Sequence, residues 1–181
     1  MHKNVENRMG LLPAITAALL LLLPCTGTAA AEDAADQKKR QDEFASGSKL
    51  YQTQKFQEAL KHFQNAAATE ADDGEARIMV GYCYYSLKQY DKALKDYTKS
   101  IKFNPDDEYS YLRRARLYLQ LSKFGPAVVD ATSALEIEPE LAEAYYYRAC
   151  GNKALGLAAQ AQRDRLKASS LGFNQAAEPL N

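Results

Sequence analysis

The sequence predicts an all-α fold, a right-handed superhelical solenoid of about four stacked helix-turn-helix units. The first observation is a spacing of 34 residues that separates Gly81, Ala115 and Ala149. The same spacing relates four further pairs: Tyr84 and Tyr118, Tyr90 and Phe124, Ala93 and Ala127, and Pro105 and Pro139. The second observation is that each repeat contains two amphipathic stretches of roughly 14 residues around a short polar break. A fixed period of this length indicates one supersecondary unit stacked on copies of itself.

The N-terminal segment, residues 1–31, has the pattern of a secretory signal peptide. Lys3 and Arg8 precede an apolar run of 13 residues, Leu11 to Leu23. This run is shorter than the about 20 residues that a membrane-spanning helix needs. Small residues follow, and Ala29 to Ala31 supply an A-x-A cleavage site. We therefore expect an exported protein, periplasmic or secreted.

Two alternatives for this segment stay open. It could be retained as a membrane anchor, although Pro13 and Pro24 disfavour a long helix. Cys25 could be lipidated after cleavage just before it, although Pro24 stands where a lipoprotein signal normally has a small residue. Membrane association is expected only through these routes.

Charge and motif content exclude several classes of function. The chain carries 23 Lys+Arg and 23 Asp+Glu, so nothing predicts electrostatic attraction to nucleic acid. No nucleophile elbow, P-loop or dinucleotide-binding glycine run is present in the sequence. His62 has no cysteine or histidine at metal-ligand spacing. We expect no cofactor, no metal and no enzymatic activity.

The two cysteines after the signal segment, Cys83 and Cys150, are expected to be free and buried. They are nearly two repeats apart in the sequence. Stacked helices are about 10 Å apart, whereas a disulfide requires Cα atoms within about 7 Å. The fold must therefore be stabilised by packing, with both thiols acting as small apolar groups.

The predicted organisation is an extension at 32–39, units at 40–73, 74–107, 108–141 and 142–175, and a tail at 176–181. Positions within a unit are called places 1 to 34 below. Polar breaks at 86–91 and 122–126 separate the two helices of units two and three. Pro105 and Pro139 are expected to end the second helices, because proline cannot continue a helix. The polar second helix of unit four is typical of a terminal cap.

Small residues at places 8 and 20 predict close helix crossings within each unit. They are Gly47, Gly81, Ala115 and Ala149 at place 8, facing Ala59, Ala93, Ala127 and Ala161 at place 20. Place 7 holds Arg114 and Arg148, and place 23 holds Asp96, Asp130 and Asp164. These arginines and aspartates predict charge-assisted structural pairs, either within one unit or with the preceding unit.

The pattern G/A-x2-Y, then A-x3-F/Y, then P resembles the tetratricopeptide repeat. The resemblance covers residues 40–175 and is most specific in units two and three. It is weaker in unit one, where Leu50 and Ala71 replace the tyrosine and the proline. It is also weaker in unit four, where Asn152, Arg165 and Phe173 replace the tyrosine, the aromatic and the proline.

The resemblance implies a concave groove lined by first-helix residues at places 2, 5, 6, 9, 12 and 13. In this sequence those places hold Glu75, Ile78, Met79, Tyr82, Tyr85, Ser86, Tyr109, Leu112, Arg113, Arg116, Leu119, Gln120, Glu143, Tyr146, Tyr147, Cys150, Lys153 and Ala154. Six tyrosines would face the groove, namely Tyr51, Tyr82, Tyr85, Tyr109, Tyr146 and Tyr147. The other six would be core: Tyr84, Tyr90, Tyr97, Tyr111, Tyr118 and Tyr145. The predicted binding residues are Tyr82, Tyr85, Tyr109, Leu112, Arg113, Arg116, Tyr146 and Tyr147, with the arginines gripping a carboxylate.

These features predict a non-enzymatic module that binds a peptide or a partner helix in a tyrosine-rich groove in the cell envelope. The carboxylate clamp of the family uses lysine and asparagine at places 5 and 9 of the first unit. Here those places hold Phe44 and Ser48, which argues against an adaptor for chaperone tails. The alternative is a scaffolding factor that acts through the ends of the array or by self-association. The sequence leaves the oligomeric state open.

Overall fold

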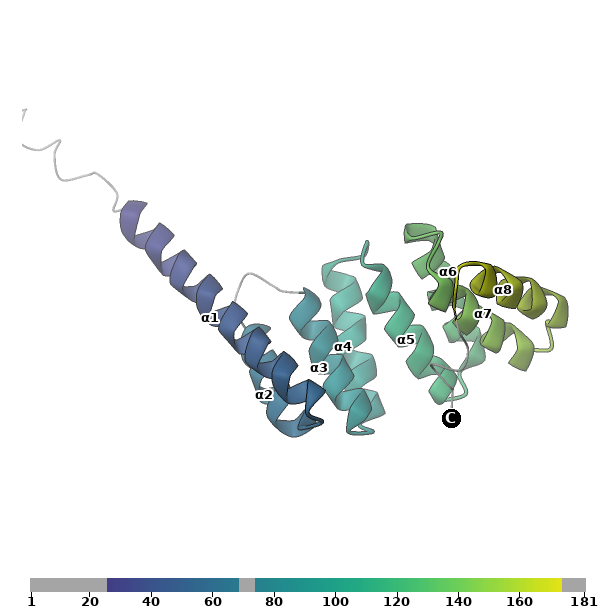
Figure 1. Ribbon diagram of the computed structural model, residues 1–181, viewed down its shortest axis with the longest axis horizontal. Coiled ribbons are helices and arrows are strands. Elements are labelled where there is room, and N and C mark those ends of the chain that lie inside the picture. The colour runs from purple at the N-terminus through teal and green to yellow at the C-terminus, as the bar shows by residue number, and fades with distance from the viewer. Residues whose placement is uncertain (1–25, 69–73, 174–181) are drawn as a thin grey trace, which may run out of the picture. The chain divides into compact units, whose positions relative to one another are not determined.

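The computed structural model describes residues 26–68 and 74–173, which form eight α-helices and no strand (Figure 1). The chain divides into two compact units, residues 1–37 and 38–181. The described part of the first unit is the start of α1. The predicted apolar run Leu11–Leu23 and the predicted tail lie outside the described residues. The all-α class predicted from the repeat is confirmed.

The helices follow the repeat in chain order. Their bounds are α1 Thr26–Gln52, α2 Phe56–Ala66, α3 Gly74–Ser86, α4 Tyr90–Phe103, α5 Glu108–Gln120, α6 Phe124–Ile137, α7 Ala142–Ala154 and α8 Ala158–Ser170. Residues 26–39, which include the predicted cleavage site, are helical and continue into the first repeat. The second helices α4 and α6 each end two residues before a proline, Pro105 and Pro139. At the start of α5, the Asp107 carboxylate accepts a hydrogen bond from the Ser110 backbone N–H at 2.9 Å, as an N-cap should.

Consecutive helices from α2 to α8 pack against each other, and α5 also packs directly on α7. No comparably close packing joins α3 to α5 within the described residues. The core consists of the small residues predicted at places 8 and 20 together with large side chains such as Phe63, Tyr97 and Leu112, all fully buried.

The glycines at place 8 correct one detail of the prediction. A Cβ added at Gly81 would lie 2.7 Å from Tyr97 Cδ1, and one added at Gly47 would lie 2.9 Å from Phe63 Cε1. The close neighbour of place 8 is therefore the aromatic ring at place 24, rather than the alanine at place 20. Glycine at place 8 accompanies an aromatic ring at place 24 in units one and two, whereas unit three has Ala115 with the small Ala131. The larger residue at place 8 thus goes with the smaller residue at place 24.

Each turn between the two helices of a unit has a residue of positive φ at place 15. These residues are Gln54 (φ 61°), Lys88 (φ 58°), Ser122 (φ 57°) and Gly156 (φ 79°). The next backbone N–H reaches back five residues to a carbonyl, for example Gln89 to Tyr84 at 2.8 Å and Lys123 to Tyr118 at 2.8 Å. This is the hydrogen bond of a Schellman motif, in which one residue in the left-handed conformation ends a right-handed α-helix.

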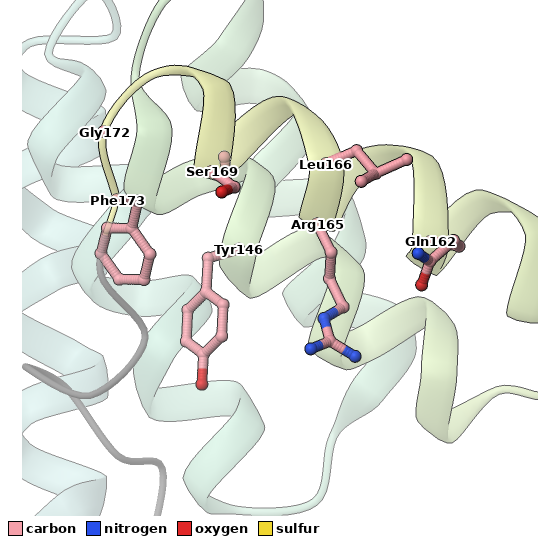
Figure 2. A pocket seen from close by; sticks show the side chains of 8 residues that line it. Tyr146, Gln162, Arg165, Leu166, Ser169, Gly172 and Phe173 are labelled. Carbon is pink, nitrogen blue, oxygen red and sulfur yellow. The ribbon is translucent and has the colours of Figure 1, made fainter.

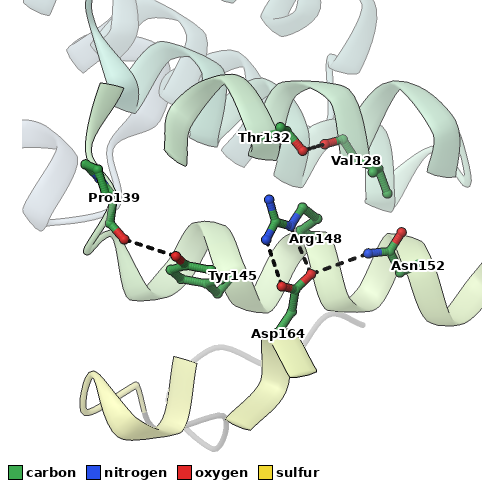
Figure 3. A network of polar contacts seen from close by, with 7 residues as sticks. All are labelled: Val128, Thr132, Pro139, Tyr145, Arg148, Asn152 and Asp164. Carbon is green, nitrogen blue, oxygen red and sulfur yellow. Dashed lines mark hydrogen bonds and ion pairs between the residues drawn. The ribbon is translucent and has the colours of Figure 1, made fainter. Parts of the chain in front are cut away.

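The predicted arginine–aspartate pairs form within a unit. Arg114 Nε and Nη2 donate to the two oxygens of Asp130 at 2.7 and 2.8 Å. Arg148 makes the same bidentate contact with Asp164 at 2.9 and 2.8 Å, and Asn152 Nδ2 also donates to Asp164 at 3.4 Å (Figure 3). The bidentate pairs raise the pKa of both arginines. Asp130 and Asp164 are buried, so these pairs join the two helices of units three and four.

Both cysteines are free, as predicted. Cys83 is fully buried, and burial raises the pKa of its thiol to about 12. Cys150 is only half-buried, so the prediction that both thiols are buried is wrong for this residue.

Candidate functional site

A hollow of about 710 Å³ lies where α3 faces the α4–α5 connection and the start of α5. We call it the groove hollow. Its lining residues are Gly74, Glu75, Ile78, Met79, Tyr82, Phe103, Asn104, Asp107 and Tyr109. Five of these occupy places assigned to a groove from the sequence, namely Glu75, Ile78, Met79, Tyr82 and Tyr109. The hollow exists because α3 and α5 are not packed as closely as α5 and α7.

Two large apolar side chains in this hollow are exposed to solvent. Phe103 is 51 % exposed and Tyr109 is 47 % exposed. Burying a large aromatic side chain contributes roughly 1.5–3 kcal/mol relative to leaving it in water. The groove hollow therefore offers apolar area that a partner could cover without unfolding the core.

A line of side chains connects the first helices of successive units. The ring of Tyr51 lies 6.3 Å from that of Tyr82, and Arg113 Cζ lies 5.0 Å from the Tyr82 ring centroid. Arg113 Nη2 is in turn 3.9 Å from Glu143 Oε2. Tyr51, Tyr82, Arg113 and Glu143 occupy places 12, 9, 6 and 2, so the line crosses the helices diagonally. A second contact joins Tyr85 to Arg116: Arg116 Cζ lies 5.4 Å from the centroid of the Tyr85 ring.

Arg113 and Arg116, which the sequence predicts to grip a carboxylate of a partner, already contact side chains of this chain. Arg113 is stacked on Tyr82 and faces a carboxylate, and Arg116 is stacked on Tyr85. Cation–π and ionic contacts of this kind hold a guanidinium in place. Burial, partly offset by Arg113, raises the pKa of Tyr82 to about 12, so its hydroxyl is neutral at physiological pH.

Three of the eight predicted binding residues are buried, which corrects the assignment. Leu112 and Tyr147 have no exposed surface and Tyr146 is 5 % exposed. All three belong to the core cluster formed where α5 packs on α7. Where α5 packs closely on α7, side chains at the groove places are buried, whereas the groove places between α3 and α5 stay open to solvent.

Tyr146 is also covered by the chain that follows α8. The ring centroids of Tyr146 and Phe173 are 4.9 Å apart, and Figure 2 shows the two rings side by side. A second hollow of about 560 Å³ next to them is lined by α8 residues that include Gln162, Arg165 and Leu166. We call this surface the C-terminal end face, because it lies on α8, the last helix that the structure describes.

The residues that sequence reasoning missed come from the second helix and its connection to the next unit. Phe103, Asn104 and Asp107 line the groove hollow, whereas the repeat pattern assigns groove places only to first helices. A signal was present, because Phe103 is a large apolar residue beside the polar sequence Asn104 to Asp107.

The described residues contain no group of three or more histidine, cysteine or acidic side chains placed to hold a metal ion. His62 Nδ1 lies 2.7 Å from Glu43 Oε2, and this hydrogen bond lowers the pKa of Glu43. None of the described helices has the length and apolar character to cross a membrane.

Comparison with known families and structures agrees with the repeat pattern. The family model described as tetratricopeptide repeat matches residues 75–107, which is unit two. The solved structure of MamA from Desulfovibrio magneticus RS-1, residues 41 to the end, has a similar fold. Its TM-score is 0.67 at 19 % identity over 74 % of this chain and 76 % of that chain. Residues 75–107 therefore match a tetratricopeptide repeat (TPR), and the chain has the fold of TPR proteins.

Two further TPR structures have partners stated in their descriptions. YrrB, described as a TPR protein with an unusual peptide-binding site, has a TM-score of 0.63 at 18 % identity over 76 % of this chain and 71 % of that chain. The first TPR domain of Spaghetti (RPAP3), bound to an HSP90 peptide, has a TM-score of 0.54 at 26 % identity over 55 % of this chain and 79 % of that chain. Comparison with curated proteins finds no significant match.

Proposed function

We propose that this TPR protein is a non-enzymatic binding module that docks a peptide or a partner helix on the face of its first helices. The docking site is the groove hollow, with Tyr82, Phe103 and Tyr109 as its aromatic surface. Tyr85 extends this surface along α3, and Arg113 and Arg116 extend it along α5. The partner is a protein, and no nucleic acid or cofactor takes part.

The observation that carries this proposal is the 710 Å³ hollow with two half-exposed aromatic side chains at its rim. Aromatic side chains give large contact area with few rotatable bonds, and they are enriched among residues that dominate binding energy. The peptide-binding character stated for YrrB and the Spaghetti domain is consistent with such a role.

The test is affinity capture of partners from a cell extract with wild type and a Phe103→Ser/Tyr109→Ser variant. Val129→Ser is the matched control, because Val129 is 64 % exposed on α6 and does not line the hollow. We expect the double variant to lose the captured partner and the control to retain it. Equal capture by all three proteins would contradict a role for the hollow.

We also propose that the protein is exported to the cell envelope of a bacterium. The support is the apolar run Leu11–Leu23 followed by Ala29 to Ala31. Mass spectrometry of the protein recovered from envelope fractions should find an N-terminus near Glu32. A mass that includes a lipid on Cys25, or an intact N-terminus, would contradict cleavage at this site.

A second function, assembly through the end of the array, is favoured by the C-terminal end face. Leu166 is 62 % exposed there, beside the hollow of about 560 Å³. Light scattering of the protein would show an assembly that Leu166→Lys disrupts. A monomer at all concentrations would contradict self-association.

A further inference from the structure

A separate hollow of about 390 Å³ lies among α2, α3 and α4 and is unusually basic. We call it the lysine hollow. It is lined by Gln64, Ala67, Arg77, Val80, Tyr84, Lys92, Lys95, Asp96 and Lys99. Among these described lining residues, four side chains are cationic and one is a carboxylate. The whole chain has no net charge, so this is a local concentration of positive charge.

The lysine hollow is distinct from the groove hollow. Its α3 residues are Arg77, Val80 and Tyr84, whereas the groove hollow uses Ile78, Met79 and Tyr82 of the same helix. Successive residues of a helix point about 100° apart because 3.6 residues complete one turn. The two sets of side chains therefore occupy different faces of α3.

The cause of the lysine hollow can be traced to one place in the repeat. In units three and four, place 7 is an arginine that reaches across to the aspartate at place 23, and Figure 3 shows the pair of unit four. In unit two, place 7 is Val80, whose short side chain cannot reach Asp96. Asp96 instead accepts from Lys99 at 3.3 Å. The space that a guanidinium fills in the later units thus remains open in unit two.

The lysines form a row along α4. Lys92, Lys95 and Lys99 extend over about 10 Å at 1.5 Å per residue. The contacts of Lys92 lie at the surface: its Nζ donates to Gln89 Oε1 at 2.8 Å and lies 5.4 Å from the Tyr84 ring centroid. Contacts of exposed lysines are weak and can be exchanged for those of a ligand.

The shape of this charge row favours one class of ligand. A small anion such as phosphate is held best by donors that converge on one point. A row about 10 Å long instead matches successive carboxylates of a peptide, which advances about 3.3 Å per residue when extended. Val80, Tyr84 and Ala67 add apolar surface beside the row.

We propose that the lysine hollow is a second docking site, which binds an acidic segment of a partner protein through Lys92, Lys95 and Lys99. Arg77 and Tyr84 contact the same segment from α3. This site acts independently of the groove hollow, so a partner could be held by two surfaces of unit two.

The test is selection of a displayed library of random 12-residue peptides on the immobilised protein. We expect enrichment of peptides rich in Asp and Glu, with binding that weakens as salt rises because exposed charges are screened. A chosen acidic peptide, labelled with fluorescein, then gives affinities by anisotropy. An isosteric peptide in which each Asp is replaced by Asn and each Glu by Gln should not bind.

Two variants locate the binding site. Lys95→Glu should weaken binding of the labelled peptide about fivefold or more, since it replaces an attraction with a repulsion. Lys102→Glu is the matched control, because Lys102 is exposed on the same helix but does not line the hollow. It should change the affinity by less than about twofold, as expected for a charge outside the contact.

Val80→Arg tests the origin of the hollow. The new guanidinium should pair with Asp96, as Arg114 pairs with Asp130, and so fill the space and abolish peptide binding. An unfolding curve at least as stable as wild type would show that the loss is not due to misfolding. If this variant does not fold, the Lys95 and Lys102 variants decide alone.

Several results would overturn the proposal. They are enrichment of basic or neutral peptides, no enrichment, or equal weakening by Lys95→Glu and Lys102→Glu. Displacement of the peptide by millimolar inorganic phosphate would identify a small-anion site instead. Loss of binding in the Phe103→Ser/Tyr109→Ser variant, with Lys95→Glu unchanged, would assign the peptide to the groove hollow.

Discussion

At the scale of single residues, the tightest constraint is the contact of place 8 with the ring at place 24. Gly81→Ala should destabilise the protein by about 1–3 kcal/mol, because the added methyl group overlaps the ring of buried Tyr97. Gly125→Ala is the matched control, since a Cβ there meets nothing within 4 Å. It should be neutral or stabilise by up to about 1 kcal/mol through helix propensity. Urea unfolding measures both, and equal effects would contradict the steric explanation.

The thiols provide a second prediction at this scale. The pKa of Cys83, raised to about 12 by burial, leaves almost no thiolate at pH 8. Burial also raises the pKa of Cys150, but this residue is half-buried. A thiol-specific reagent should therefore label Cys150 slowly in the native protein and Cys83 only after unfolding. Peptide mapping of the labelled sites would contradict this if Cys83 reacted first.

At the scale of the element, the turn at place 15 combines a fixed conformation with a variable residue. Ser122 has φ 57°, a region that costs a residue other than glycine roughly 1–2 kcal/mol. Ser122→Gly should therefore stabilise the protein by about 0.5–1 kcal/mol, and Gly156→Ala, at φ 79°, should destabilise it by a similar or larger amount. Thermal unfolding of the two variants should shift in opposite directions. Shifts in the same direction would contradict the shared turn geometry.

These turns show what the sequence could and could not predict. The 34-residue period and the apolar pattern predicted the helix pairs, because both depend on residue type at regular places. The left-handed turns were not predicted, since place 15 holds Gln54, Lys88, Ser122 and Gly156, and only one of these is glycine. The fold imposes this conformation through the helix crossing, whatever side chain is present.

The candidate groove was predicted in part for a related reason. The places assigned from the repeat identified Tyr82 and Tyr109 at the groove hollow, but also Leu112, Tyr146 and Tyr147, which are buried. A repeat pattern treats every unit as equivalent. In this chain the packing of neighbouring first helices is not uniform: α5 packs on α7 more closely than α3 packs on α5. That difference depends on side chains in several units at once, so single places cannot reveal it.

At the scale of the whole array, stability is expected to be the sum of contributions from units and their neighbours. At the C-terminal end of the described helices, Phe173 covers the ring of Tyr146. The Phe173 backbone N–H donates to the Ala168 carbonyl at 3.0 Å, which turns the chain back over α7. The covering of this end therefore depends on one side chain that stands where units two and three have a proline.

Phe173→Ala should consequently destabilise the end of the array and leave the rest unchanged. Hydrogen exchange, read by mass spectrometry on the native protein, should become faster in α7 and α8, by an amount that corresponds to about 1 kcal/mol for the loss of a half-buried ring. Exchange in α2, α3 and α4 should not change, because these helices do not pack on α7 or α8, where Tyr146 and Phe173 act. Val129→Ala is the control, since its side chain on α6 is already 64 % exposed and does not line the hollow at this end. Uniformly faster exchange in all helices would instead show that the array opens as one cooperative unit.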